Sequence, residues 1–168
     1  MASEKARVAV FETVLGWTGI AVSTKGLAGL VLPRPDRDEV EARLRREYPG
    51  ASWVEPSALA PYVEQIVEYS AGRRDAFELP LDIPPSTPFH RQVWEALLQI
   101  PRGETRSYTW VAEQVGRPRA VRAVGQAVGA NPIPLVLPCH RVLRSDGSLG
   151  GFGGGLELKQ RLLELERG

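Results

Sequence analysis

The sequence predicts an α+β protein of two domains: a small N-terminal antiparallel sheet with helices, then a mostly helical C-terminal domain with a helix-turn-helix. Three observations support this class. Short β-type segments with glycine turns run from Arg7 to Leu32, capped helical segments dominate the later sequence, and four prolines between Leu79 and Pro88 separate the two groups. We therefore expect domains at residues 1–85 and 86–168, joined by a linker over 79–88.

The first domain begins with apolar segments that are too short and too regularly interrupted by turns for helices. Strands are expected at 8–11, 18–22 and 30–32, with turns at Gly16 and Lys25-Gly26. Two helices are expected next, over 36–48 and 58–71, because Pro49 and Gly72 end them.

The second domain opens on Thr87-Pro88, an N-cap followed by a first-turn proline, which predicts a helix through Gln99. Two short helices are then expected, over 109–115 and from Pro118 to about Ala130, around a turn at Gly116-Arg117. Two helices around a glycine turn suggest a helix-turn-helix, although this pattern is weak evidence alone.

The second of these short helices has an unusual distribution of side chains. Val121, Val124 and Val128 share one face, and Arg119, Arg122 and Gln126 share another. Only glycine and alanine lie between them: Ala120, Ala123, Gly125, Ala127, Gly129 and Ala130. Such a flat surface suggests that something large approaches it, but small residues equally permit close packing of helices.

Charge divides unevenly between the two halves. Residues 1–85 hold ten Lys or Arg against thirteen Asp or Glu, whereas residues 86–168 hold eleven against seven. The basic second half is compatible with nucleic-acid binding, and an ordinary solvated surface explains it equally well. The N-terminus lacks the apolar stretch of a signal peptide and no run is long enough for a membrane span, so we expect a prokaryotic cytoplasmic protein.

The only cysteine, Cys139, precedes His140 and Arg141 after an apolar run broken by prolines. A lone thiol forms no internal disulfide, and the neighbouring imidazole and guanidinium would favour its reactive thiolate. A buried structural cysteine is the alternative. A metal site is disfavoured because one cysteine and two distant histidines provide too few ligands.

Several motifs in the second half resemble the O6-alkylguanine-DNA alkyltransferase family. They are Asn131-Pro132-Ile133-Pro134-Leu135-Val136-Leu137-Pro138-Cys139-His140-Arg141-Val142, Phe89-His90-Arg91-Gln92-Val93-Trp94, Ser107-Tyr108, Arg122-Ala123-Val124-Gly125 and 150–156. The resemblance covers residues 86–166 closely and the first half loosely. For the first half it implies an RNase H-like domain.

The resemblance implies direct reversal of DNA damage, in which an alkyl group on guanine O6 moves irreversibly to Cys139, so that each molecule acts once. The partner would be double-stranded DNA, bound through its minor groove by a monomer that flips the damaged nucleotide out. No cofactor and no metal are expected, since the cysteines that bind zinc in some relatives are absent. The preferred alkyl group and activity on O4-alkylthymine are left open.

Site roles follow from the same resemblance. His140 would act as a base through a water, Glu166 would orient it, Asn131 would brace the active-site turn, and Tyr108 would donate a proton to the purine. Arg122 would fill the gap left by the flipped nucleotide. Neighbouring DNA contacts are expected from Arg119, Ala120, Ala123, Gly125 and Gln126, and pocket walls from Val142, Phe152, Gly153 and Gly154. The family often has tyrosine where Phe152 stands.

Two expectations about this site also rest on geometry. Adjacent strand residues point to opposite faces, so Cys139 and His140 need a turn or a bridging water to cooperate. Glu166 falls among leucines on its predicted helix, where a carboxylate is costly unless paired. His140 is one candidate partner, and Lys159, on the same arc, is the other.

Three other functions remain as alternatives. A lesion-binding relative without catalysis would keep the fold, but Cys139 argues against it. A helix-turn-helix regulator, alone or fused to a repair domain, would not need the Cys-His-Arg sequence. A cysteine hydrolase would require oxyanion donors, for which the sequence gives no sign.

Overall fold

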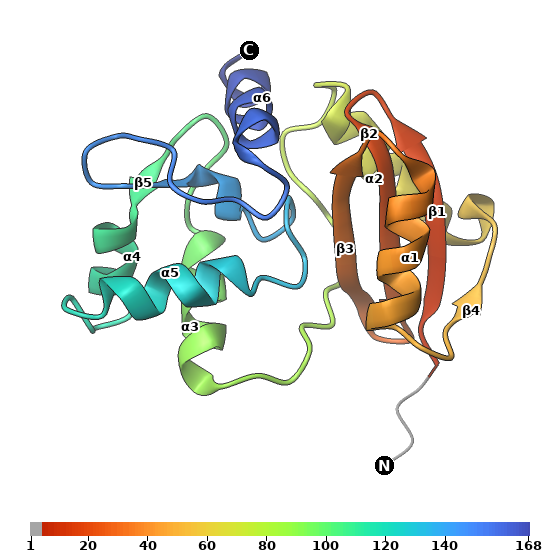
Figure 1. Cartoon of the computed structure of the whole chain (residues 1–168), viewed down its shortest axis with the longest axis horizontal. Coiled ribbons are helices and arrows are strands. Elements are labelled where there is room, and N and C mark those ends of the chain that lie inside the picture. Colours follow the sequence, from red (N-terminus) through yellow and green to blue (C-terminus); the bar gives the residue numbers. More distant parts are fainter. Residues whose placement is uncertain (1–4) are drawn as a thin grey trace. The chain divides into compact units, whose positions relative to one another are not determined.

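The computed structural model in Figure 1 describes residues 5–168. These residues divide into two compact units, of which the first ends at Pro84 and the second begins at Pro85. That division falls one residue before the expected boundary. The mixed α+β class is confirmed, with a mainly antiparallel sheet in the first unit and mostly helices in the second.

The first unit is built on a four-stranded sheet. Its strands are β1 (Arg7–Thr13), β2 (Gly16–Ser23), β3 (Gly26–Arg34) and β4 (Ser52–Trp53), in the order β3-β2-β1-β4. The three expected strands pair antiparallel, as the sequence predicted. Strand β4 was not predicted, and it pairs parallel to β1, so the sheet is not wholly antiparallel. Two residues are too few to show the alternation that identifies a strand.

Helix α1 (Arg37–Glu47) covers one face of this sheet (Figure 1). Asp36 caps it by accepting a hydrogen bond from the Asp38 backbone N–H at 2.9 Å. The helix comes so close to β2 that a Cβ on Gly19 would lie 2.8 Å from side-chain atoms of α1. The buried core beneath it contains Val8, Val10, Ala21, Val31, Val40 and Leu44. A 3-10 turn (Pro56–Leu59) leads into α2 (Ala60–Ser70), which completes the unit.

The expected linker is partly fixed to the first unit. The Leu27 N–H donates to the Pro80 carbonyl at 2.9 Å, and the Asp82 N–H donates to the Leu27 carbonyl at 2.8 Å. Ser23 Oγ also donates to Asp82 Oδ2 at 2.6 Å. The interpretation of 79–88 as a linker was therefore wrong for its first part, because the Pro80 carbonyl and the Asp82 N–H pair with Leu27 in β3.

The second unit is mostly helical. Its helices are α3 (Pro88–Leu97), α4 (Tyr108–Gln114), α5 (Val121–Gly129) and α6 (Leu156–Arg167), with two-residue strands β5 (Arg106–Ser107) and β6 (Val142–Leu143). Thr87 caps α3 as predicted, by accepting from the His90 N–H at 3.1 Å. Trp94 Nε1 donates to the Ala127 carbonyl at 2.8 Å and ties α3 to α5. None of the helices between residues 5 and 168 is long and apolar enough to cross a membrane.

Helices α4 and α5 form the expected helix-turn-helix arrangement around Gly116, whose φ of 76° favours glycine. However, α5 begins at Val121, three residues later than predicted. The Ala120 N–H donates to the Arg117 carbonyl at 2.9 Å, so Arg117 to Ala120 form a turn of their own before the helix. Of the three valines expected to share one face, Val124 and Val128 are buried, whereas Val121, in the first turn, is 36% exposed.

Candidate active site

The cysteine lies in the turn that the sequence analysis required. Cys139, His140 and Arg141 form a single turn of 3-10 helix immediately before β6, so they do not continue a strand. Cys139 is 6% exposed and His140 is fully buried. Because they lie in a turn, Cys139 and His140 are not forced onto opposite faces as they would be in a strand, so the two side chains can act together.

Asn131 braces the segment that precedes the cysteine. Its Nδ2 donates to the Leu137 carbonyl at 2.7 Å, and its Oδ1 accepts from the Ile133 N–H at 2.9 Å. Between them, buried Leu135 has a φ of 75°, a left-handed conformation that costs a non-glycine residue about 1–2 kcal/mol. The two Asn131 hydrogen bonds help to hold this strained backbone closed.

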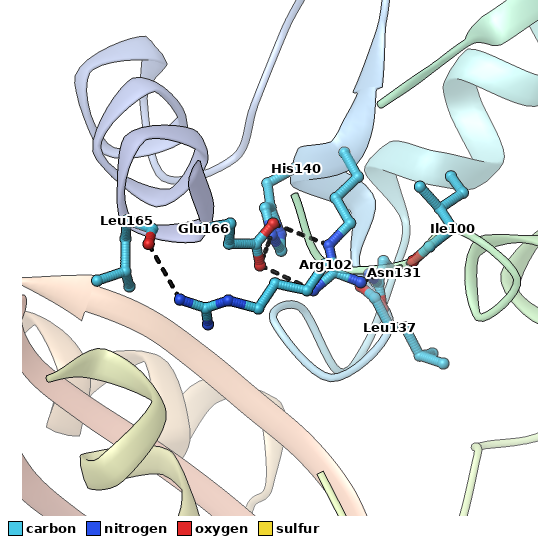
Figure 2. Close-up of polar contacts among 8 residues, drawn as sticks. Ile100, Arg102, Asn131, Leu137, His140, Leu165 and Glu166 are labelled. Atoms are coloured by element: carbon cyan, nitrogen blue, oxygen red, sulfur yellow. Dashed lines mark hydrogen bonds and ion pairs between the residues drawn. The ribbon is translucent and has the colours of Figure 1, made fainter. Parts of the chain in front are cut away.

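Glu166 joins the histidine and the arginine in one buried cluster (Figure 2). His140 Nε2 lies 2.8 Å from Glu166 Oε2, while Arg141 donates to both oxygens of the same carboxylate, at 2.9 and 2.8 Å. Arg141 Nη1 also donates to the Ile100 carbonyl at 2.7 Å. A carboxylate paired with a guanidinium only accepts hydrogen bonds, so Nε2 carries the imidazole proton and Nδ1 carries the lone pair.

The structure also decides between the two partners left open for Glu166. Lys159 is fully buried on the same helix, but its ammonium donates to backbone carbonyls, those of Val142 at 2.7 Å, of Leu149, and of Gly151 at 3.5 Å. It therefore ties the glycine-rich loop to β6. Glu166 pairs with His140 and Arg141 instead.

The cysteine is a neutral thiol in the resting protein. Burial raises the pKa of Cys139 to about 11, and the Asn131 side chain and the charge of Lys159 lower it by less. The expectation that His140 and Arg141 favour the thiolate was wrong, because both side chains are turned toward Glu166. Burial also lowers the pKa of His140, against the opposing effect of Glu166, so the imidazole is neutral and able to accept a proton.

Tyr108 begins α4, where the Ser107 side chain caps the helix by accepting from the Trp110 N–H at 2.9 Å. Its ring lies against Gly150, where a Cβ would come within 3.2 Å of it. Burial raises the pKa of Tyr108, as does the negative charge that Cys139 carries once it is ionised, whereas Arg144 lowers it. The phenol therefore keeps its proton at neutral pH and can donate it.

The expected pocket residues differ in accessibility. Val142 is fully buried in β6, Phe152 and Gly154 are half-buried, and Gly153 is exposed. The Phe152 ring centroid lies 5.9 Å from Lys159 Nζ, so the buried ammonium contacts this loop through the ring as well as through carbonyls.

The expected DNA-contacting residues lie at the start and along the exposed side of α5. Arg122, Ala123 and Gln126 are exposed on the helix, Arg119 is exposed in the turn before it, and Ala120 and Gly125 are half-buried. Arg119 is thus not on the helix, contrary to the prediction, because α5 begins at Val121. A Cβ on Gly125 would meet no described atom within 4 Å, so packing inside the protein does not require glycine there.

Sequence reasoning missed two features of the site. Arg141 belongs to the Glu166 cluster, although the sequence analysis treated it only as a neighbour of the thiol. Lys159 supports the loop through backbone carbonyls, which leave no signature in the sequence. Within residues 5–168, no group of three or more His, Cys, Asp or Glu side chains is placed to hold a metal ion.

Fold and site together define a class of protein. An α+β domain is followed by a mostly helical one, which has a helix-turn-helix and a buried cysteine beside a histidine–glutamate pair. Residues 88–168 match the family model described as 6-O-methylguanine DNA methyltransferase, DNA binding domain. The methylated-DNA--protein-cysteine methyltransferase of Mycolicibacterium paratuberculosis is 51% identical over 137 residues, covering 78% of this chain and 82% of the relative. The inducible Bacillus subtilis protein of that name is 42% identical over 149 residues, covering 88% and 83%.

A solved structure agrees with these sequence matches. The crystal structure of Mycobacterium tuberculosis OGT in complex with DNA superposes with a TM-score of 0.80 at 39% identity, covering 96% of this chain and 92% of that one. The chain therefore belongs to the methylated-DNA--protein-cysteine methyltransferase family, as its motifs predicted.

Proposed function

We propose that this protein repairs DNA by direct reversal, moving an alkyl group, typically methyl, from O6 of guanine in double-stranded DNA to Sγ of Cys139. The observation that carries the proposal is the buried Cys139 turn beside the His140–Glu166 pair, in a chain that belongs to this family. The reaction is a displacement at the alkyl carbon, in which an S–C bond forms and the C–O6 bond breaks.

The proton movements follow from the resting state of the site. Cys139 holds its proton at neutral pH, so a base must remove it as sulfur attacks. Glu166 fixes the proton of His140 on Nε2, and Nδ1 takes up the thiol proton through a bridging water. The electron pair of the broken bond between the alkyl carbon and O6 passes to the purine. The purine leaves as guanine after Tyr108 donates a proton. Tyrosinate then recovers a proton from the imidazolium through solvent.

The proposed reaction occurs once per molecule. A thioether has no proton to lose and is a poor leaving group, and the chain has no second cysteine to act as a resolving thiol. The product is an S-alkylated protein, and the protein is consumed in a ratio of one molecule to one lesion.

DNA binding is proposed through the minor groove, with α5 entering and the damaged nucleotide flipped out. O6 lies in the stacked duplex on the major-groove edge, out of reach of a thiol on the other side unless the nucleotide rotates out. Exposed Arg122, flanked by Ala123 and Gly125, is the side chain that fills the gap. We propose that a monomer suffices, since every proposed site residue comes from the second unit of one chain.

The proposal is tested by measuring whether the lesion is removed from DNA. A duplex with one O6-methylguanine inside a restriction site is incubated with increasing protein, and restored cleavage reports repair. The proposal predicts that repair stops at one lesion per protein and that Cys139→Ser repairs none. Binding of the lesion duplex without restored cleavage by the native protein would instead identify a non-catalytic lesion-binding protein.

A further inference from the structure

The segment Ile100–Gly103, between α3 and β5, lies against the Glu166 cluster, and Figure 2 shows the contacts of Ile100 and Arg102. The Ile100 carbonyl accepts from Arg141 Nη1 at 2.7 Å, and Arg102 Nη2 donates to the Leu165 carbonyl at 3.0 Å. A Cβ on Gly103 would lie 3.3 Å from the Glu166 carbonyl oxygen. The segment thus touches both the guanidinium that holds Glu166 and the backbone that carries it.

The Arg102 hydrogen bond satisfies a backbone carbonyl in the last turn of helix α6. The helix ends at Arg167, so the carbonyls of its last turn have no partner within the helix. A guanidinium at a helix C-terminus satisfies such a carbonyl and interacts favourably with the helix dipole. Because Leu165 precedes Glu166, Arg102 fixes the backbone beside the carboxylate that holds His140.

We propose that Arg102 is a positioning residue for alkyl transfer: it holds the last turn of α6 so that Glu166 keeps the His140 imidazole in its productive orientation. The inference rests on the proposed function. Arg102 touches no reacting atom and acts through Leu165 and Glu166. A small displacement of a catalytic group can slow a reaction by up to about a hundredfold, so a distant anchor of this kind is measurable.

The test combines kinetics with a double-mutant cycle. Methyl transfer is followed with lesion DNA in excess. Because each protein acts once, the amplitude then reports the active fraction of the protein and the rate constant reports the site. Arg102→Met, which keeps the aliphatic stem, should lower the rate constant about tenfold, and Arg102→Lys, which keeps a cationic donor, should recover most of it. Arg161→Met, at an exposed arginine of the same helix, is the matched control and should leave the rate unchanged.

The cycle separates positioning from simple support of the fold. In a Glu166→Gln background Arg102→Met should slow transfer by no more than about twofold further, because the group it positions is already altered. An equal loss in both backgrounds would overturn the inference. If Arg102→Met does not fold, Arg102→Gln takes its place in the cycle.

A second readout does not depend on the reaction. The chain has two histidines, so nitrogen-labelled histidine gives two sets of imidazole signals. The His140 Nε2–H signal should shift and exchange faster with water in Arg102→Met than in native protein, and an unchanged signal would overturn the inference. If the native protein transfers no methyl group, the proposed function fails, but this signal still tests whether Arg102 positions His140.

Discussion

Replacement of Glu166 by glutamine should be among the most destabilising single changes in the second unit. The Glu166 side chain is 1% exposed, and its carboxylate accepts one hydrogen bond from His140 and two from Arg141. Glutamine has nearly the same shape, so the change removes the charge without opening a cavity. It leaves the guanidinium of Arg141, a residue that is 8% exposed, without the counter-charge of Glu166.

Breaking a buried ion pair from one side typically costs about 3–5 kcal/mol, because the remaining charge stays buried. We expect a loss of this size in the free energy of unfolding, which is a large share of the ~5–15 kcal/mol of a typical domain. The assay is labelling of Cys139, the only thiol, at increasing urea concentration, because it reports opening of the second unit alone.

Glu164→Gln is the matched control for this experiment. Glu164 is exposed on the same helix and accepts only a 3.3 Å hydrogen bond from Gln160 among the contacts that the structure gives it. Its replacement should change the unfolding free energy by about 0.5 kcal/mol or less. A loss below about 1 kcal/mol for Glu166→Gln would refute the reasoning, since it would mean that Arg141 finds another partner or reaches water.

Three further predictions concern the thiol and the helix. Because burial raises the pKa of Cys139 to about 11, the rate of its reaction with iodoacetamide should keep rising up to about pH 11. A rate that levels off near neutral pH would contradict a neutral thiol in the resting protein. Methylation adds volume at Cys139, a residue that is only 6% exposed, and should cost ~1–3 kcal/mol, lowering the Tm by about 2 °C or more in calorimetry. An equal or higher Tm would count against this prediction. Arg122→Ala should slow repair of duplex DNA by about tenfold or more, because unstacking the damaged base costs a few kcal/mol. It should leave the rate with a free O6-alkylguanine base unchanged. Equal losses on both substrates would disprove the gap-filling role.

Much of the fold could be predicted from local signals. Glycine turns and short apolar segments located the three main strands, and the Thr87-Pro88 cap located α3. The late start of α5 was missed because a hydrogen bond from Ala120 to Arg117 makes a turn in a sequence that is otherwise compatible with a helix. Strand β4 was missed because its pairing, and not its composition, defines it.

The site was predicted only in part, because some of its contacts depend on how the folded chain brings side chains and carbonyls together. A carboxylate among leucines requires a buried partner, which left His140 and Lys159 as candidates, and only the family resemblance favoured His140. The direction of the Cys139 pKa was predicted wrongly, because proximity in sequence suggested charges that the turn directs elsewhere. Lys159 was ambiguous because its acceptors are backbone carbonyls, which every residue possesses and which only the folded chain brings together.

Direct reversal requires that Cys139 itself receives the alkyl group. Its most direct test is the intact mass of the protein after incubation with a duplex containing one O6-methylguanine, followed by peptide mapping, with Cys139→Ser in parallel. We expect a gain of one methyl group per protein, located on Cys139, with unmodified guanine recovered in the DNA and no gain in the variant. An unchanged mass with the lesion intact, or a methyl group on another residue, would contradict it.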